Sequence, residues 1–408
     1  MAQAQQPKLT SIDVSDPRLY QDDTWHELFA QLRRDDPVHY CEASPFGPYW
    51  SVTRYDDIFA VELDHANYSS SSEFGGIQIT DQPLGQEFAN FIRMDPPGHT
   101  AHRRTVAPIV APSHLANFEP LIRKRTSDVL DALPRNETFD WAERVSTDLT
   151  NMMLATLFDF PWEDRTKLTW WSDVAIANVE SPDAVVHSQA ERVTELTKMG
   201  EYFRKLWDAR AAAPPAFDLI SMLSHSEATR NLQAREFIGT IALLIVGGND
   251  TTRNSMTGGL MALVENPGQF ELLRAKHDLI PNLVSETIRY HTPVLHMRRT
   301  ARADVELAGR SIAKGDKVVM WYISGNRDEG KIDRADQFII DRAKPRQHLA
   351  FGAGIHRCVG DRLAEQQIRI LWEEILQRDL RFEIMGPPQR LYSNFIRGIR
   401  SLPVRIVS

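Results

Sequence analysis

The sequence contains little cysteine: only Cys41 and Cys358 occur in 408 residues. This scarcity argues against a disulfide-stabilised scaffold, which needs several cysteines in a short chain. It also argues against a zinc site built on cysteine pairs, because no second cysteine lies near either one. Each cysteine therefore needs its own explanation. Cys41, in the strand-like segment PVHYCEAS, is expected to be a small buried hydrophobe.

Excess basic charge and long apolar runs are also lacking. The 47 Lys and Arg are outnumbered by 55 Asp and Glu, and the resulting net charge of −8 argues against a nucleic-acid partner. No apolar run approaches the roughly 20 residues that span a bilayer. The N-terminus, MAQAQQPKLTSIDVSDPRLY, lacks the charged-then-apolar pattern of a secretion signal. We therefore expect a cytoplasmic protein with no membrane span and no nucleic-acid partner.

Helical spacing of apolar residues dominates the rest of the sequence. It predicts helices over most of the segment from about 99 to 210, a long apolar helix over about 233–264, and a helix after Cys358. Strand-like patterns are confined to short segments such as VHYC, YWSVT and KVVMWY and to the C-terminal tail. No internal repeat or low-complexity linker divides the chain. We expect residues 1–408 to form a single domain, mainly α with a minor β part.

The loop HLAFGAGIHRCVG gives Cys358 an unusual setting. Glycines at 352, 354 and 360 permit positive φ angles and a close approach of backbone N–H groups. These groups, together with the N-terminus of the following helix, are expected to lower the pKa of the Cys358 thiol. A thiolate with one coordinating partner suits this setting, and the simpler alternative is an inert buried thiol. A nucleophilic role would need a histidine partner that the sequence does not locate.

The segment FGAGIHRCVG resembles the haem-binding signature of the cytochrome P-450 superfamily, F-G-x-G-x-[HR]-x-C-x-G, at every specified position. The resemblance implies that Cys358 is the thiolate ligand of haem b iron and that Phe351 packs against it. It also implies the fold of that family, a triangular prism with haem between a long central helix and the helix of the cysteine loop. Three further motifs follow the family's order, so the resemblance covers nearly the whole chain.

The segment SETIRY carries Glu286 and Arg289, three residues apart on one predicted helix face. Taken alone, this is an ordinary surface ion pair worth a few tenths of a kcal/mol. It resembles the family's E-x-x-R pair, which is partly buried and anchors the irregular stretch before the haem loop. The family usually supplies a third, basic partner at the position that is Gln337 here. Arg342 is the candidate to replace it.

The segment LLIVGGNDTTRN places two adjacent glycines inside the predicted central helix. Each costs about 1 kcal/mol relative to alanine, which a helix tolerates where a neighbour must approach its backbone. Tight helix packing is one explanation. The segment also resembles the family's [AG]-G-x-[DE]-T motif, which implies that Asp250 and Thr251 relay protons to dioxygen as a catalytic pair. The same resemblance implies that Gly248 leaves room for O2.

His99 and Arg103, in MDPPGHTAHRRTV, lie four residues apart on a predicted helix and suit an anionic group. They resemble the family motif D-P-P-x-H-x-x-x-R, whose histidine and arginine hold the haem propionates. The resemblance implies that His356 and one arginine of HMRRTA complete the set, and we favour Arg299 over Arg298. A solvated surface charge is the alternative for any one of them.

Longer segments, among them LIVGGNDTTRNSMTGGL and YHTPVLHMRRTA, resemble the alkane-hydroxylase branch of the soluble bacterial class. The resemblance implies a monooxygenase that uses O2 to hydroxylate terminal methyl groups of medium-chain alkanes or fatty acids. Electrons would come from a [2Fe-2S] ferredoxin and its NAD(P)H-dependent reductase. The pocket positions of the family are apolar here, with core packing as the alternative for each: Ile77, Leu243, Val246, Val294, Leu295 and Phe395.

Basic residues close to Cys358 in the sequence suit the docking of an acidic ferredoxin, with ordinary surface charge as the alternative. They are Lys344, Arg346, Arg357 and Arg362. Other functions stay open: hydroxylation of terpenes or other apolar small molecules, a peroxide-driven haem-thiolate enzyme, and a haem-thiolate sensor without turnover. The pair Asp250 and Thr251 argues against the peroxide-driven enzyme, which would normally lack it.

Overall fold

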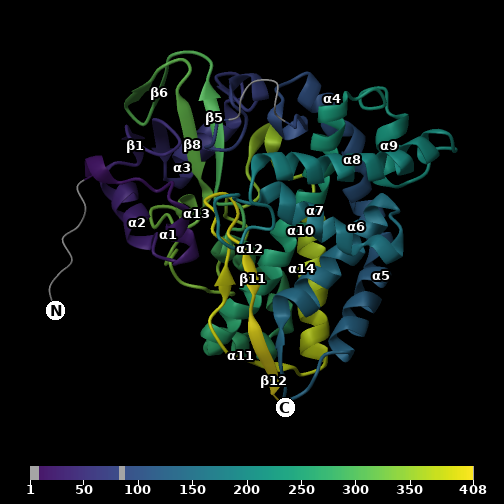
Figure 1. The fold of residues 1–408 in the computed structure, drawn as a ribbon. Coiled ribbons are helices and arrows are strands. Elements are labelled where there is room, and N and C mark those ends of the chain that lie inside the picture. The colour runs from purple at the N-terminus through teal and green to yellow at the C-terminus, as the bar shows by residue number, and fades with distance from the viewer. Residues whose placement is uncertain (1–8, 82–87, 408) are drawn as a thin grey trace.

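The long helix α10 (Ala234–Glu265) runs through the centre of the molecule and confirms the apolar helix expected from the sequence (Figure 1). The computed structural model describes residues 9–81 and 88–407. Side chains of α10 are buried on most of its circumference, because other helices pack around it. These are α6 (Asp148–Phe158), α7 (Thr166–Ile176), α8 (Gln189–Ala211), α12 (Ile280–His291) and α14 (Asp361–Gln377).

Local chemistry sets several helix starts. The side chain of Ser188 accepts a hydrogen bond from the backbone N–H of Glu191 and caps α8, as N-terminal serines commonly do. Proline occupies the first turn of α5, α11 and α12, where its missing N–H costs nothing. Further helices are α1 (Pro17–Gln21), α2 (His26–Asp35), α3 (Tyr55–Leu63), α4 (Gly98–Val106), α5 (Pro112–Asp131), α9 (Leu219–His225), α11 (Pro267–Ala275) and α13 (Tyr322–Gly325).

The main sheet has the strand order β1-β2-β8-β5-β3. Its strands are β1 (Val38–Cys41), β2 (Tyr49–Val52), β3 (Tyr68–Ser69), β5 (His296–Ala301) and β8 (Lys317–Trp321). β5 pairs antiparallel with β8, so its successive side chains point to opposite faces of the sheet. Cys41, at the end of β1, is buried, as its sequence context predicted.

Smaller strand groups complete the β part. β4 (Thr138–Asp140), β12 (Pro403–Val407) and β9 (Arg381–Ile384) form a sheet in that order near the C-terminus. The pairs β6–β7 (Val305–Leu307 and Arg310–Ile312) and β10–β11 (Gln389–Arg390 and Ile399–Ser401) are antiparallel ribbons.

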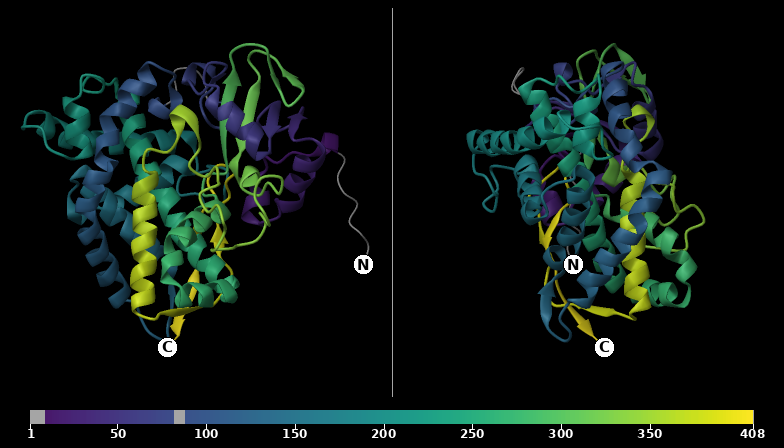
Figure 2. Two further views of the ribbon diagram at one scale, coloured as in Figure 1. Left: turned by 180° about the vertical axis from the view of Figure 1, so that it is seen from behind. Right: turned by 90° about the vertical axis from the view of Figure 1, so that its right-hand side faces the viewer.

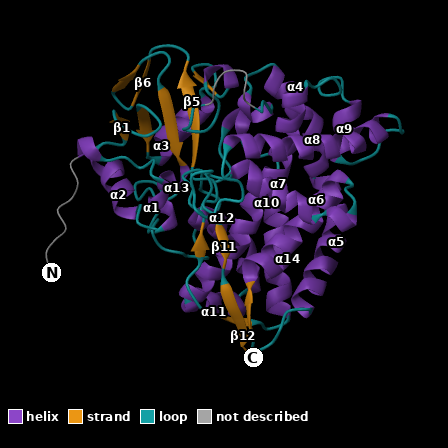
Figure 3. Ribbon diagram, viewed as in Figure 1, coloured by secondary structure: helices purple, strands orange, loops and turns teal. Residues whose placement is uncertain are grey.

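Helices dominate the molecule, and the main sheet lies to one side of them (Figure 3). The outline is broad at the end that holds this sheet and narrows toward the C-terminus (Figure 1). Seen from behind, the main sheet with the N-terminal helices remains separate from the helices of the middle of the chain (Figure 2). The mainly α architecture with a minor β part is therefore confirmed. Within the described ranges, no helix combines the length and apolar character needed to cross a membrane.

Candidate active site

A cavity lies between α10 and the loop that precedes α14. Its walls are mostly apolar, and among the described residues its charged lining is confined to Glu62, Arg103 and Arg299, together with the ring of His356. Many residues singled out from the sequence line it: Ile77, Arg103, Leu243, Gly248, Thr251, Val294, Arg299, Phe351, His356 and Cys358. Motifs spread over much of the chain thus converge on one space.

The cysteine loop is shaped by backbone requirements. Gly352 and Gly354 have φ angles of 65° and 62°, in the left-handed region that side chains disfavour. A Cβ on Gly354 would lie 2.4 Å from the backbone oxygen of Glu62, so the loop fits directly against the end of α3. The backbone N–H of Cys358 donates to the oxygen of Phe351 at 2.8 Å and closes the loop. The thiol is thereby directed into the cavity.

The protein alone does not favour the Cys358 thiolate. The thiol has accessible surface only because it faces the cavity, and it otherwise lies deep inside the protein. Burial raises its pKa to about 11, and this outweighs the opposing hydrogen bond from Gly360 and the charges of Arg103 and Arg357. The expected lowering of this pKa is therefore wrong for the chain by itself. A metal ion bound at the sulfur would supply the missing stabilisation, because coordination deprotonates a thiol.

His99 and His356 meet at one edge of the cavity. Their rings lie 4.3 Å apart, and the Nε2 of His356 is 2.8 Å from the hydroxyl of Ser70. Burial lowers the pKa of His99 to about 4 and that of His356 to about 2, so both rings are neutral. Both ring nitrogens of His99 and the Nδ1 of His356 lack a hydrogen-bond partner among the described residues. Buried donors without partners are costly, so an acceptor-rich group is expected to lie beside them.

Strand alternation separates the two arginines of HMRRTA. Arg299 points into the cavity, where its Nη2 donates to a carboxylate oxygen of Glu62 at 2.9 Å. Arg298 points to the other face of β5, where it bonds Asp81 and the backbone oxygen of Phe74. Arg299 is thus the arginine that reaches the site, as expected from the sequence.

The adjacent glycines of α10 do different things. A Cβ on Gly247 would meet no atom within 4 Å, so this glycine leaves open space at the cavity. A Cβ on Gly248 would lie 2.6 Å from a methyl carbon of Leu154 on α6, so Gly248 is required by helix packing. Both glycines line the cavity, and the open space beside α10 lies at Gly247. The hydroxyl of Thr251, one turn on, donates to the backbone oxygen of Gly247 at 3.0 Å.

The structure does not bring Asp250 to the cavity beside Thr251. Asp250 is fully buried and accepts a hydrogen bond from the hydroxyl of Ser172 on α7 at 2.6 Å. It also pairs with Arg253, which bonds Asp173 at 2.5 Å. Successive helix residues are about 100° apart around the axis, so Thr251 and Asp250 face different neighbours. Burial raises the pKa of Asp250 above its ordinary value.

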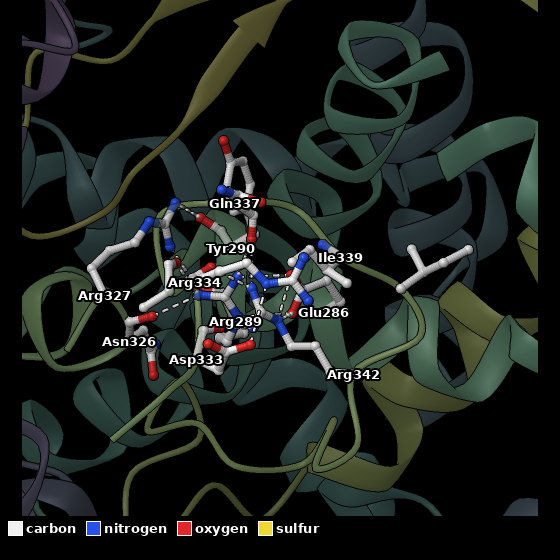
Figure 4. A network of polar contacts seen from close by, with 12 residues as sticks. Glu286, Arg289, Tyr290, Asn326, Arg327, Asp333, Arg334, Gln337, Ile339 and Arg342 are labelled. Carbon is white, nitrogen blue, oxygen red and sulfur yellow. Dashed lines mark hydrogen bonds and ion pairs between the residues drawn. The ribbon is translucent and has the colours of Figure 1, made fainter. Parts of the chain in front are cut away.

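Glu286, on α12, lies between two arginines (Figure 4). Arg289 binds its two carboxylate oxygens at 2.7 Å each, and the Nε of Arg342 lies 3.0 Å from both. The backbone N–H of Ile339 donates to the same carboxylate at 2.7 Å. Arg342 therefore fills the place of the missing third partner, while Gln337 contributes its backbone oxygen to both arginines. This network fastens the irregular stretch that leads to the cysteine loop.

Comparison with known proteins agrees with this geometry. The family model described as Cytochrome P450 matches residues 183–391. The chain is 36% identical over 407 residues to linalool 8-monooxygenase of Pseudomonas putida, with 97% of this chain and 98% of that protein covered. The chain belongs to the cytochrome P450 family. It is also 33% identical to the methyl-branched lipid omega-hydroxylase of Mycobacterium tuberculosis, covering 94% of this chain and 91% of that protein.

A solved P450 structure shares the fold of this chain. CYP153D17 from Sphingomonas sp. PAMC 26605 superposes with a TM-score of 0.91 at 48% identity, covering 97% of this chain and 99% of that one. Cytochromes P450 carry haem with a cysteine thiolate ligand. The cavity fits this group, because Cys358 faces the space and the unpartnered nitrogens of His99 and His356 lie at the edge that also holds Arg103.

Pocket residues expected from the sequence divide into two groups. Ile77, Leu243 and Val294 line the P450 cavity. Leu295 does not: it is fully buried in the N-terminal core cluster, because it points the opposite way from Val294 along the extended chain. Its assignment to the pocket is wrong.

Val246 and Phe395 are also absent from the cavity wall among the described residues. Val246 lies on a different side of α10 from Leu243 and Gly247, which are one turn apart. The ring of Phe395 lies 5.4 Å from that of His296 and does not reach the cavity.

Several lining residues carry no signal in the sequence. Met153 and Leu157 come from α6, and their four-residue spacing is the ordinary pattern of a core helix. Glu62 and Tyr322 also line the cavity, and both are buried. A carboxylate in the helical segment YDDIFAVEL reads as a surface residue, so only the tertiary fold brings Glu62 to the site.

Proposed function

We propose that this cytochrome P450 hydroxylates the terminal methyl group of medium-chain alkanes or fatty acids. The observation that carries the proposal is the distribution of charge around the cavity. Among the described residues, the charged lining groups belong to the edge near His356, and the wall formed by Leu243, Leu244 and Val294 is apolar. A linear hydrocarbon needs only such a wall, because each CH₂ group that is buried there stabilises binding by about 0.8 kcal/mol.

The same distribution favours the chain end over other positions. A fatty acid that entered carboxylate first would bury its charge against an apolar wall, which costs several kcal/mol without a partner. The methyl end therefore goes in first and would reach the haem on the side of α10. The names of two relatives support this: omega denotes the end of a lipid chain, and carbon 8 of linalool is a methyl at the end of its chain.

The residues of the site have distinct roles in this proposal. Cys358 would bind the haem iron, and haem would supply the activation of dioxygen that the family uses. Phe351 would shield the sulfur, while His99, Arg103, His356 and Arg299 would hold the propionates. Gly247 leaves open space in the cavity, and the hydroxyl of Thr251 would move protons into that space.

Asp250 serves as the source of these protons once its side chain leaves Arg253. Its raised pKa makes it easier to protonate than an exposed aspartate, and Asp173 stays behind to pair with Arg253. Thr251→Ala should uncouple the enzyme, so that NADH is consumed with little hydroxylated product. Tight coupling in this variant would remove Thr251 from the proton relay.

A [2Fe-2S] ferredoxin with its NAD(P)H-dependent reductase is the proposed electron source. The basic surface near the cysteine loop supports it, although Arg346 pairs with Glu365 and Arg357 pairs with Asp361 at the surface. Both pairs are exposed and therefore weak. Carboxylates of an acidic partner can therefore take the place of Glu365 and Asp361 beside the two arginines. Turnover with ferredoxin and reductase should exceed turnover with hydrogen peroxide. The reverse ranking would favour a peroxide-driven enzyme.

The substrate class is tested by optical titration of the haem-loaded protein with octane, dodecanoic acid and linalool. A substrate that binds beside the haem would shift the Soret band, so the three compounds can be ranked by their dissociation constants. Octane or dodecanoic acid should bind more tightly than linalool. Tighter binding of linalool would favour the second candidate, a terpene hydroxylase, which the 36% identity to linalool 8-monooxygenase supports.

A further inference from the structure

Glu62 is a buried carboxylate at the charged edge of the cavity, and none of the roles proposed above uses it. It lies near the end of α3, and its side chain is 1% exposed. One carboxylate oxygen accepts from the Nη2 of Arg299 at 2.9 Å, and the other accepts from the hydroxyl of Tyr322. Glu62, Arg299 and Tyr322 all line the cavity.

The position of Glu62 is set by the cysteine loop itself. A Cβ on Gly352 would lie 3.3 Å from the carboxylate of Glu62, and a Cβ on Gly354 would meet its backbone oxygen at 2.4 Å. Both glycines have positive φ, so the loop backbone approaches α3 where a side chain would block it. The distance between the Glu62 carboxylate and the loop that carries Cys358 is therefore fixed by backbone packing.

The hydrogen bonds around Glu62 keep its charge in place. Tyr322 is fully buried, and burial together with the Glu62 carboxylate raises the pKa of its hydroxyl well above the ordinary value. The hydroxyl is thus a permanent donor to Glu62. The other nitrogen of Arg299, Nη1, donates to the backbone oxygen of Arg298 at 2.9 Å, which holds the guanidinium in a single orientation.

One guanidinium serves two anions in this arrangement. Arg299 already pairs with Glu62, and in the proposed function it also holds a haem propionate. Arg103 and the rings of His99 and His356 face the same edge, but they make no hydrogen bond to Glu62. The negative charge of Glu62 is therefore only partly compensated, and in a poorly hydrated site such a charge acts over several ångströms.

We propose that Glu62 is a positioning residue that lowers the reduction potential of the bound haem iron. Reduction adds one electron, delivered by the iron–sulfur partner, and breaks no bond. Because the added charge is negative, a fixed carboxylate at the haem edge opposes it. By holding Arg299, Glu62 also limits how much positive charge that arginine lends to the propionate. The inference rests on the proposed role of Arg299.

The test is the reduction potential of purified, haem-loaded protein, measured by spectroelectrochemical titration without substrate. Glu62→Gln keeps the shape and removes the charge, so its potential should be more positive than that of the wild type. Glu62→Asp keeps the charge and should stay closer to the wild type than Glu62→Gln does. An unchanged potential in Glu62→Gln, or an equal shift in both variants, would overturn the proposal.

Two further variants separate this inference from other failures. Glu374 is also buried and paired with two arginines, Arg123 and Arg378, but it lies outside the cavity wall. Glu374→Gln should therefore leave the potential unchanged, and a shift equal to that of Glu62→Gln would make the effect a general consequence of destabilisation. Arg299→Gln should move the potential in the negative direction, and no movement would refute the role of Arg299. None of these measurements depends on which substrate the enzyme hydroxylates.

Discussion

Two buried carboxylates, Glu286 and Asp250, share the same local pattern and have opposite surroundings. Each is fully buried, and each binds an arginine three residues later on its own helix, Arg289 and Arg253 respectively. Around Glu286 there are two arginines for one carboxylate, because Arg342 joins from the irregular stretch before the cysteine loop. Around Asp250 there are two carboxylates for one arginine, because Arg253 also binds Asp173.

This difference in stoichiometry separates an anchor from a group that can move. Arg289 is further held by the backbone oxygens of Asn326, Ala335 and Gln337, so the Glu286 network ties three segments together. The Asp250 network has a spare carboxylate, and Arg253 keeps a partner when Asp250 is protonated or turns away. A buried ion pair at the same sequence spacing can thus be structural or functional, and the third charged group decides which.

The largest expected effect comes from breaking the anchor. Glu286→Gln leaves Arg289 and Arg342 buried without a counter-charge, which should lower the free energy of unfolding by about 3–5 kcal/mol. The same variant should retain little haem, since the stretch before the cysteine loop loses its attachment. Urea unfolding and the haem-to-protein absorbance ratio measure the two effects. If Glu286→Gln were as stable as the wild type, Glu286 would not be an anchor and would not differ from Asp250 in this respect.

Removing the replacement partner should cost less than removing the carboxylate. Arg342→Ala leaves Glu286 paired with Arg289, so we expect a loss of about 2 kcal/mol in unfolding free energy, within the range for one buried charged hydrogen-bond partner. Arg346→Ala is the matched control, because its exposed pair with Glu365 should contribute less than about 1 kcal/mol. Equal effects in the two variants would mean that Arg342 is not the third member of the network.

Asp250→Asn should be nearly neutral for stability and damaging for turnover. Arg253 keeps its bond to Asp173, so the unfolding free energy should change by less than about 1 kcal/mol, well below the cost at a fully paired buried charge. Coupling of NADH use to product should fall, because an amide does not carry a proton to Thr251. If Asp250→Asn were as destabilising as Glu286→Gln, the Asp250 network would be a structural anchor like the Glu286 network.

The smallest expected effect is a difference in pH dependence. Burial raises the pKa of Asp250 in the folded state, so the folded protein binds this proton more readily than the unfolded chain does. As the pH falls toward that raised pKa, the unfolding free energy of the wild type should therefore increase relative to that of Asp250→Asn. At pH values above the raised pKa, ionised Asp250 lowers the stability of the folded protein. Urea unfolding of both proteins between about pH 5 and 8 measures how the difference in unfolding free energy changes with pH. If Asp250 had a normal aspartate pKa, this change would be absent.

The candidate site was predicted best where its residues lie in short contiguous motifs. Cys358, Phe351 and His356 share one loop, and His99 and Arg103 share one helical turn. The motifs by which the chain resembles the P450 family were therefore enough to group them. Assignments that depend on which way a side chain points were less successful. Asp250 and Leu295 sit beside residues that do line the cavity, Thr251 and Val294. Gly248 lines the cavity but packs against Leu154, and the open space lies at its neighbour Gly247.

By itself, the sequence determined the cysteine loop, the long central helix and the mainly α architecture, because these depend on glycine backbone freedom and on helical periodicity, which are local properties. The tertiary structure decided the rest. Rotation of α10 against α6 and α7 turned Asp250 toward Ser172 and placed Gly248 against Leu154. Long-range packing brought Glu62 to Arg299 and Arg342 to Glu286, across 237 and 56 residues of chain, and no local pattern encodes such distances.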